Sequence, residues 1–242
     1  MAGGGSQQDL RAEFAIAFGH DSQAVLIQWG VALGARVSNS FTVDVAHFAE
    51  RHGLMIIIVL GESVISVALA AQEAAVTVRL AVGVLCGLAA SAAMWWCYFA
   101  GDDERAAAAF ARLEPRRRGG VALRGYDLTH VFMLAGVVAV AAGSRHALPD
   151  LTAATDLAAA TLIAGGLAAY LLALAAFRAI VRFANPVPRL AAAVVMPASI
   201  PIGTALGAAQ QLLSAAAAIA VLLVVERRLT APSVGRSPDP AG

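Results

Sequence analysis

The stretch HFAERHGLMIIIVLGESVISVALAA, residues 47–71, decides the fold of this chain. Its apolar part, Gly53 to Ala71, has nineteen residues, close to the roughly 20 that cross a hydrocarbon core of about 30 Å. Glu62 is the tenth of these nineteen residues. An ionised carboxylate at the bilayer midplane costs about 3 kcal/mol on insertion scales, and the surrounding Leu, Ile and Val residues offset roughly that amount. The stretch therefore predicts a membrane-spanning helix with one acid at its middle.

The composition of the whole chain supports the same environment. Hydrophobic residues make up 60% of the chain and charged residues 14%, whereas soluble domains carry about 25% charged residues. Mean hydropathy is +0.74. The apolar residues recur in blocks of about twenty, whereas a membrane barrel would need alternating segments of about ten. The predicted fold class is all-α, a polytopic transmembrane helix bundle of about seven spans, and the lipid bilayer is its expected partner.

Seven apolar blocks are candidate spans: residues 12–35, 53–71, 77–99, 128–148, 157–181, 190–209 and 212–225. Polar residues at 19–23 interrupt the first block. Two interpretations of it stay open: it crosses the membrane with its polar middle sheltered by other helices, or only 24–35 are embedded as an interfacial piece. Pro197 and Pro201 predict a kink in the sixth block. Trp95, Trp96 and Tyr98 are typical of a membrane–water interface.

Three parts of the chain differ in composition. Residues 1–10 predict a disordered N-terminus, residues 11–229 a transmembrane helical domain, and residues 230–242 a disordered tail. Within the domain, residues 101–127 predict a charged cytoplasmic loop with a short amphipathic helix near 102–113. Asp102, Asp103 and Glu104 are interpreted as solvated acids at the start of that helix.

The arginines set the expected orientation. All 17 basic residues are Arg, and fourteen of them fall on one side of a seven-span topology. By the positive-inside rule this side is cytoplasmic, so we expect a cell-membrane protein with its C-terminus in the cytoplasm. The arginines flank apolar blocks and do not form a folded basic face, and the net charge is +1, so no nucleic-acid partner is expected.

The polar residues inside the apolar blocks are the functional candidates. Glu62, Ser63, Ser66 and His130 are candidates for a proton relay or an ion contact within the membrane. We expect His130 to face either Glu62 or the level of the helix that carries Glu50 and Arg51. The equal alternative is a histidine at a helix end whose hydrogen bonds are satisfied. For Glu62 the alternative is a protonated or hydrogen-bonded side chain that only fixes helix packing.

His47, Glu50, Arg51 and His52 form a predicted motif at the cytoplasmic entrance of the helix. Glu50 and His47 are i, i+3 neighbours, and Arg51 is suited to a lipid headgroup. The two histidines lie five residues apart and point to different sides of a helix, so no metal site is predicted. No nucleophile elbow, phosphate loop or dinucleotide fingerprint is present in the sequence. We therefore expect neither an enzymatic centre nor a cofactor.

Residues 47–64, HFAERHGLMIIIVLGESV, resemble the signature of the bacterial low temperature requirement A family of multi-pass membrane proteins. Residues 126–143, YDLTHVFMLAGVVAVAAG, and the helix from Tyr170 to Arg178 are similar to later family stretches, so the resemblance covers about residues 40–228. It implies a membrane protein associated with growth at low temperature, without an agreed biochemical activity. The family motif falls on His47, Glu50, Arg51, Gly53, Gly61, Glu62, Ser63 and His130.

Family members resemble this chain in their later part and carry an additional membrane half. We therefore expect the chain to correspond to the C-terminal part of a family member, with a missing N-terminal membrane half or further copies of itself as partners. Two functions of different classes follow. One is ion- or proton-coupled transport through a site that contains Glu62, and the other is a structural or sensory membrane module whose polar residues only fix packing.

Overall fold

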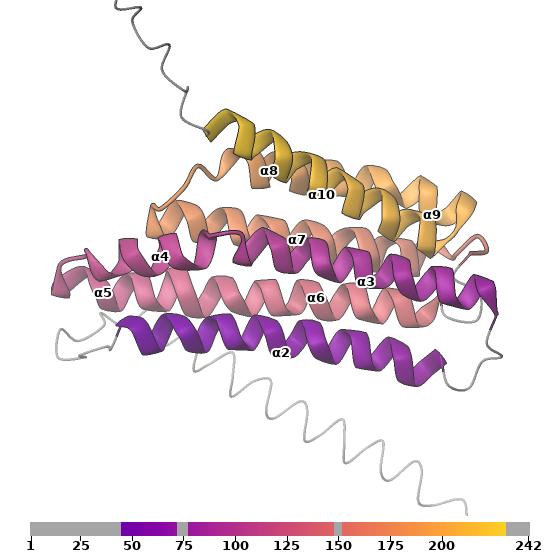
Figure 1. The fold of residues 1–242 in the computed structure, drawn as a ribbon, viewed down its shortest axis with the longest axis horizontal. Coiled ribbons are helices and arrows are strands. Elements are labelled where there is room, and N and C mark those ends of the chain that lie inside the picture. Colours follow the sequence, from indigo (N-terminus) through magenta and orange to yellow (C-terminus); the bar gives the residue numbers. More distant parts are fainter. Residues whose placement is uncertain (1–44, 72–76, 148–151, 231–242) are drawn as a thin grey trace, which may run out of the picture.

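The computed structural model describes residues 45–71, 77–147 and 152–230, and every element in these ranges is helical (Figure 1). The predicted all-α class is confirmed. The elements in order are α2 (Val45–Ala71), α3 (Val78–Phe99), α4 (Asp102–Ala111), α5 (Pro115–Val121), the π-helix η1 (Ala122–Leu128), α6 (Thr129–His146), α7 (Leu157–Val181), α8 (Val187–Val195), the 3₁₀-helix η3 (Met196–Ser199), α9 (Ile200–Leu206) and α10 (Ala208–Thr230).

Five helical stretches in these ranges are long and apolar enough to cross a membrane: Val78–Ala111, Pro115–His146, Leu157–Val181, Val187–Leu206 and Ala208–Arg228. They cover five of the seven predicted blocks. The block at 53–71 falls in α2, a helix of 27 residues. The block at 12–35 lies outside the described residues, as do residues 1–10 and 231–242. Seven spans, and both interpretations of the first block, therefore stay predictions.

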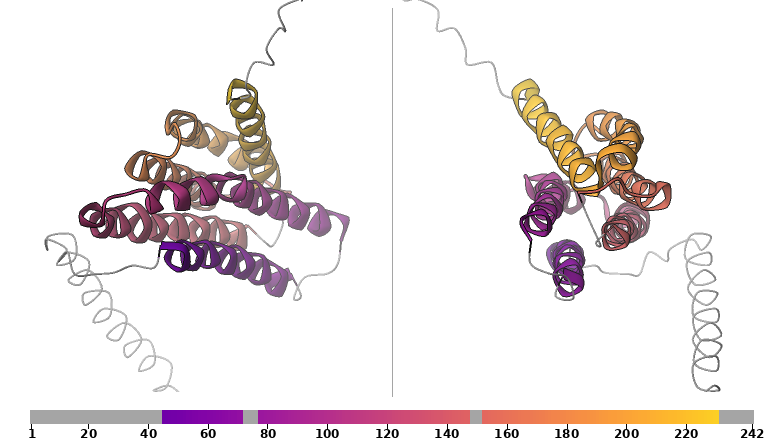
Figure 2. Two further views of the ribbon diagram at one scale, coloured as in Figure 1. Left: turned by 60° about the vertical axis from the view of Figure 1, so that its left-hand side comes forward. Right: turned by 90° about the vertical axis from the view of Figure 1, so that its right-hand side faces the viewer.

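The long helices form a bundle in which α2 lies at one edge and α10 crosses the opposite side (Figures 1 and 2). α2 packs against α3, α4 and α6, while α7 packs between α6 and α8. α3 contacts both α2 and α10. We call the end of the bundle that holds α4, the start of α6 and the C-terminus of α10 the α4 end.

Glycines bring α6 and α7 into backbone contact. A Cβ atom placed on Gly136 would lie 2.6 Å from the carbonyl oxygen of Gly166, and a Cβ on Gly166 would lie 2.6 Å from that of Gly136. About two turns further along α6, a Cβ on Gly143 would meet the Ala159 oxygen at 2.8 Å. Contacts this short leave no space for a side chain, so these glycines set the separation of the two helices.

The sequence signals for helix ends are visible in the structure. Thr77 caps α3, its hydroxyl oxygen accepting a hydrogen bond from the Leu80 N–H at 3.2 Å. The predicted irregularity at Pro197 appears as η3, a short 3₁₀ segment between α8 and α9. The chain then breaks at Gly207, whose φ of 119° a larger residue adopts only with strain, and α10 begins at the next residue.

The charged segment 101–127 is helical through most of its length. α4 corresponds to the predicted short helix, and α5 and η1 follow it and lead directly into α6. The prediction that Asp102 is a solvated acid is wrong, because only 1% of its side chain is exposed. Its carboxylate accepts two hydrogen bonds from Arg178 of α7, at 2.6 Å and 2.9 Å. Its partner Arg178 is 76 residues away in sequence, so the residues around Asp102 alone do not show that it is buried.

Arg178 and Asp102 belong to a larger buried set that we call the arginine–carboxylate network: Asp102, Arg178, Arg189 and Glu226. Arg178 donates to Glu226 at 2.5 Å and Arg189 donates to the other oxygen of Glu226 at 2.6 Å. Both guanidinium groups are nearly inaccessible. Two cations and two anions balance each other, so the network joins α4, α7, α8 and α10 at the α4 end without a net buried charge.

Candidate functional site

His52 of α2 is bonded through both of its ring nitrogens. Nδ1 lies 2.8 Å from the carbonyl oxygen of Phe48, which can only accept, so Nδ1 carries a proton. Nε2 lies 3.0 Å from Oδ1 of Asp127. A hydrogen bond at this second contact requires a proton between Nε2 and the carboxylate oxygen.

The two partners differ in their access to solvent. The side chain of His52 is 6% exposed, whereas that of Asp127 is 35% exposed. Asp127 lies in η1 at the α4 end, immediately before α6. The carboxylate therefore connects a buried imidazole to the outside of the bundle.

His130 of α6 lies next to this pair. Its ring centre is 4.9 Å from that of His52, and the residue is 1% exposed. Nδ1 donates to the Tyr126 carbonyl oxygen at 2.8 Å, and Nε2 lies 2.9 Å from the hydroxyl of Tyr98. In the neutral ring Nε2 accepts a hydrogen bond from the Tyr98 hydroxyl. Two positive rings at this separation would repel each other, so the histidines hold one extra proton more readily than two.

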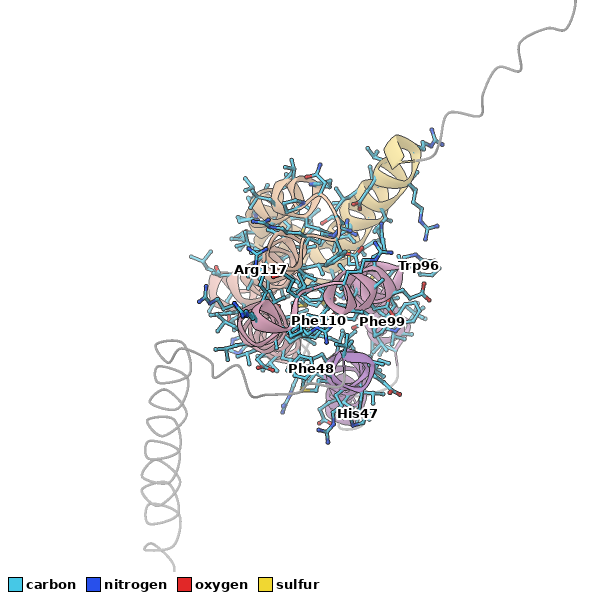
Figure 3. All side chains as sticks on the ribbon, turned by 90° about the vertical axis from the view of Figure 1, so that its left-hand side faces the viewer. His47, Phe48, Trp96, Phe99, Phe110 and Arg117 are labelled. Atoms are coloured by element: carbon cyan, nitrogen blue, oxygen red, sulfur yellow. The ribbon has the colours of Figure 1, made fainter. Side chains whose placement is uncertain are left out.

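Aromatic rings enclose both histidines. Tyr126 stacks on His130, and the edge of Phe177 meets His130 at a centroid distance of 5.1 Å. Phe48 lies 4.5 Å from His52 by ring centroids. Figure 3 shows Phe48 directed from α2 toward Phe110, while His47 points away from the bundle. We call His52, Tyr98, Tyr126, Asp127 and His130 the histidine cluster.

The π-helix η1 positions three members of this cluster. A π-helix has a wider turn than an α-helix, and such segments are frequent at functional sites. Tyr126 and Asp127 lie in η1, and His130 lies in the first turn of α6. As a result the Tyr126 ring and carbonyl face His130 while the next residue, Asp127, reaches α2.

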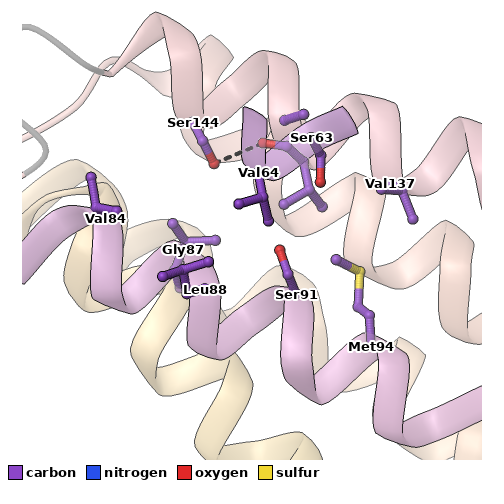
Figure 4. A pocket seen from close by; sticks show the side chains of 12 residues that line it. Ser63, Val64, Val84, Gly87, Leu88, Ser91, Met94, Val137 and Ser144 are labelled. Carbon is purple, nitrogen blue, oxygen red and sulfur yellow. Dashed lines mark hydrogen bonds between the residues drawn. The ribbon is translucent and has the colours of Figure 1, made fainter. Parts of the chain in front are cut away.

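A second polar region lies further along the same helices. A cavity of about 30 Å³ is lined by residues of α2, α3, α6 and α10, among them Ser63, Ser91 and Ser144 (Figure 4). Ser63 donates to the Leu60 carbonyl at 2.7 Å, and Ser144 donates to the Val140 carbonyl at 2.8 Å. The oxygen of Ser91 is directed from α3 toward the cavity. Three hydroxyl groups from three helices thus line one space.

Buried apolar side chains separate the histidine cluster from the serine-lined cavity. Ile56 and Leu60 lie between His52 and Ser63 along α2, Met94 lies between Tyr98 and Ser91 on α3, and Met133 and Val137 follow His130 on α6. All five are buried. At about 1.5 Å per residue, the eleven positions from His52 to Ser63 span roughly 16 Å. The two polar regions are therefore distinct layers of the bundle.

The structure does not bring Glu62 to His130. Glu62 is exposed on the surface of α2, as is Gly61, while His130 is enclosed in the histidine cluster. Ser63 is half-buried at the serine-lined cavity. Ser66 lies in α2, but its side chain lies outside the described part of the structure. The position of Glu62 relative to the bilayer stays a prediction.

The predicted entrance motif divides between surface and interior. His47, Glu50 and Arg51 are exposed, while His52 is buried in the histidine cluster. Gly53 is buried, and a Cβ on it would lie 3.6 Å from the ring of Phe99, so it packs α2 closely against α3. The motif thus lies at the α4 end, but only its inward face contributes to the site.

Two partners of the histidines, Tyr98 and Asp127, are not predictable from their local sequence. Tyr98 was predicted at a membrane–water interface with Trp95 and Trp96; the tryptophans are exposed, but Tyr98 is buried against His130. The spacing of Asp127 and His130 by three residues placed both at the start of a span, yet Asp127 bonds to α2. Within the described ranges, no group of three His, Cys, Asp or Glu side chains is arranged to hold a metal ion.

The family model of the bacterial low temperature requirement A protein (LtrA) matches residues 13–225. The range includes the histidine cluster, the serine-lined cavity and three of the four residues of the arginine–carboxylate network; Glu226 is the residue after its end. Neither the curated proteins nor the solved structures gave a match to this chain.

Proposed function

Since this chain belongs to the bacterial low temperature requirement A family and is a multi-pass membrane protein, we propose that it carries out proton-coupled transport, with the histidine cluster as the group that takes up and releases the proton. The proposal is non-enzymatic. One observation carries it: Nε2 of His52 lies 3.0 Å from Oδ1 of the partly exposed Asp127, and the His52 ring lies 4.9 Å from the buried ring of His130.

The proton path follows from the hydrogen bonds. Asp127 exchanges protons with water at the α4 end and passes them to Nε2 of His52. A positive charge that arrives at His52 from Asp127 lies 4.9 Å from the ring of His130 and would repel a second positive charge there, so it changes the polarity of the whole cluster. The buried apolar side chains between the two polar regions then act as a barrier that must open before the serine-lined cavity connects to the histidine cluster. They are Ile56, Leu60, Met94, Met133 and Val137.

A flux assay tests this proposal. The full chain in liposomes with an enclosed pH indicator is exposed to a pH gradient, and His52→Gln is compared with wild type. We expect proton flux to fall about tenfold or more, because glutamine keeps the hydrogen-bonding size but cannot carry the proton. His47→Gln is the matched control on the same helix, since His47 is exposed, and its flux should stay within about twofold of wild type. Equal flux in all three proteins contradicts the proposal.

Glu62 can be separated from the histidine cluster in the same assay. Our sequence-based hypothesis assigns the coupled proton to Glu62, whereas the geometry favours His52 and Asp127. If Glu62→Gln retains wild-type flux while Asp127→Asn loses it, the proton passes through the cluster. Loss in Glu62→Gln alone would return the role to the acid of α2.

The second candidate function, a structural or sensory module, is favoured by the internal hydrogen bonds of the polar residues. Both nitrogens of His130 are bonded within the protein, and Ser63 and Ser144 bond to their own helix backbones. For such a module, His130→Gln lowers the melting temperature in detergent, and neither wild type nor variant conducts protons. Wild-type flux above that of empty liposomes rules this candidate out.

A further inference from the structure

An open groove runs along the outside of the bundle between α3 and α10. Its volume is about 550 Å³, which falls within the roughly 300–1,000 Å³ of sites that bind small molecules. Its two walls belong to stretches that are long and apolar enough to cross a membrane, Val78–Ala111 and Ala208–Arg228. The groove therefore faces the hydrocarbon of the bilayer, so lipid molecules can reach it directly.

Most of the groove is apolar, and it ends in two residues with polar groups. Apart from Trp96 and Arg227, its lining consists of Ala, Leu and Val side chains from the two helices. Leu213 is 53% exposed and Val224 is 49% exposed, so the apolar surface is open to a neighbouring molecule. An acyl chain that lies along this surface leaves no polar group without a partner.

Arg227 and Trp96 form the polar end of the groove. The guanidinium carbon of Arg227 lies over the Trp96 ring, 6.0 Å from its centre. Trp96 is 48% exposed, and Figure 3 shows it on the outer side of α3. Tryptophan and arginine are the residues that mark the level of the lipid headgroups on membrane helices. This end of the groove therefore lies at the headgroups of the leaflet at the α4 end.

The length of the groove matches one leaflet. The fourteen positions from Leu213 to Arg227 on α10 span roughly 21 Å, at about 1.5 Å per residue. A bilayer is about 40–45 Å thick with its headgroups, so one leaflet is about 20–22 Å. A phospholipid whose headgroup lies at Arg227 can thus extend its chains along the whole groove.

The charge at the polar end suits an anion. Among the described residues that line the groove there is no acid. The acid next to Arg227 in sequence, Glu226, has its two oxygens bonded to Arg178 and Arg189 inside the bundle, at 2.5 Å and 2.6 Å. A guanidinium presents its N–H donors in a planar fork, which fits two oxygens of a phosphate group.

We propose that this groove binds one anionic phospholipid, with its phosphate at Arg227 and an acyl chain along the apolar lining. A zwitterionic phospholipid has the same chains and phosphate, but its ammonium group cancels the net charge and weakens the attraction to Arg227. The proposal goes beyond proton transport, because binding of a lipid can be measured when no flux is present.

A second copy of this chain fits the groove less well. In a symmetric dimer the same patch of both chains meets, so the partner brings its own Arg227 to the same level of the membrane. Two guanidinium groups at that level repel each other, whereas a phosphate attracts the one that is there. A second copy and the apolar block at residues 12–35 are the other occupants that the experiment distinguishes.

A lipid titration tests the proposal. The full chain, freed of lipid in a neutral detergent, receives phosphatidylglycerol or phosphatidylcholine with identical acyl chains, and native mass spectrometry counts the bound molecules. We expect one phosphatidylglycerol per chain, bound about fivefold more tightly than phosphatidylcholine, which is the effect of one basic residue on an anionic lipid. Glycerol phosphate, a headgroup without chains, should not displace it. Equal affinity for the two lipids, or displacement by glycerol phosphate, overturns the proposal.

Two matched pairs of variants locate the lipid. Arg227→Gln should abolish the preference for phosphatidylglycerol, whereas Arg228→Gln, at an exposed neighbour that does not line the groove, should keep it. Ala220→Leu should weaken both lipids about three- to tenfold, because its side chain takes the space of the acyl chain. Ala218→Leu, on the exposed surface outside the groove, should bind as wild type does. An unchanged preference in Arg227→Gln places the lipid elsewhere and overturns the proposal.

Stability and oligomeric state give a second readout. Phosphatidylglycerol should raise the melting temperature of wild type and Arg228→Gln more than that of Arg227→Gln, because a ligand of the folded state stabilises it. If no lipid binds and wild type is a dimer that Ala220→Leu dissociates, the groove holds a second copy. If no lipid binds and wild type is monomeric, the groove is covered by the chain itself or holds nothing. Either of these two results overturns the proposal.

Discussion

At the scale of the residue, Asp102 and Arg178 show how charged groups are accommodated inside this bundle. The guanidinium is planar and meets the carboxylate through two parallel hydrogen bonds, and its third edge reaches Glu226. Neither side chain of the Asp102–Arg178 pair is more than 1% exposed. Removal of Arg178 leaves Asp102 buried with the single bond from Arg105, at 2.8 Å, in place of three charge-assisted hydrogen bonds.

The first prediction follows from this pair. Arg178→Met should lower the free energy of unfolding by about 1.5–3 kcal/mol, because the buried Asp102 loses two charge-assisted hydrogen bonds and keeps only the one from Arg105. The double variant Asp102→Leu with Arg178→Met should recover part of the loss, since both charges are gone. Unfolding in mixed micelles measures both. Glu114→Gln, at an exposed acid, should change little, and a single variant no weaker than this control would contradict the prediction.

A second prediction concerns Asp156, which caps α7 outside the membrane spans. The Ala159 N–H donates to its carboxylate at 2.7 Å and, with His146, holds its pKa below the ordinary value. A carboxylate with a lowered folded-state pKa stabilises the fold above the unfolded value of about 3.9, and this contribution is lost as pH falls through the folded pKa. The melting temperature of wild type should therefore drop more steeply below about pH 4 than that of Asp156→Ser, which keeps a capping oxygen. Parallel curves would contradict this.

Residue chemistry also explains what sequence could and could not predict. Glu62, His130 and the apolar blocks stand out locally, because a charge or an imidazole in an apolar run is visible in one window. The pairs Asp102–Arg178, His52–Asp127 and Tyr98–His130 join positions 76, 75 and 32 residues apart. A local window cannot show which distant helix supplies a partner. The helices were therefore predictable, whereas the partners that bury Asp102 and Tyr98 were not.

At the scale of the element, glycines explain why α6 and α7 pack with their backbones in contact. The third prediction is that Gly136→Ala lowers the free energy of unfolding by about 1–3 kcal/mol, since its methyl would lie 2.6 Å from the Gly166 oxygen. Gly165→Ala is the matched control, because nothing lies within 4 Å of a Cβ there and alanine favours the helix. Thermal unfolding in detergent compares the two. Equal melting temperatures of Gly136→Ala and Gly165→Ala would mean that α6 and α7 can move apart to make room for the methyl group, which contradicts the prediction.

The α8–η3–α9 segment shows where sequence predicts an element well. Pro197 and Pro201 lack backbone donors; the chain forms a 3₁₀ segment at Met196–Ser199 around Pro197, and Pro201 lies in the first turn of α9. The predicted end of that span, residue 209, is two residues beyond the observed break at Gly207. The positive φ of Gly207 depends on tertiary packing, which the pattern of apolar residues does not specify.

At the scale of the whole molecule, the arginines lie mainly at one end. Two of the arginines counted for orientation, Arg178 and Arg189, are paired with acids in the arginine–carboxylate network. Most of the others at the α4 end lie on or beside α4, α5 and the end of α10. The expected orientation therefore does not depend on the buried pair.

The fourth prediction tests this orientation with reporters fused to the full chain. A fluorescent protein fused after residue 242 should be bright and alkaline phosphatase at the same place inactive, because the arginine-rich α4 end is expected in the cytoplasm. Phosphatase inserted at residues 148–151, at the opposite end of α6, should be active. The reverse pattern would invert the bundle and place Asp127 on the outer side.

The backbone contact of Gly136 with Gly166 has a mechanical consequence. Helices that touch through their backbones have no side chains to repack between them, so α6 and α7 move as one rigid frame. α2 lies at the edge of the bundle and reaches that frame through side chains, with the His52–Asp127 bond as its polar attachment. If an additional proton weakens that bond, α2 is the helix that can shift, and the α6–α7 pair is the fixed surface along which it shifts.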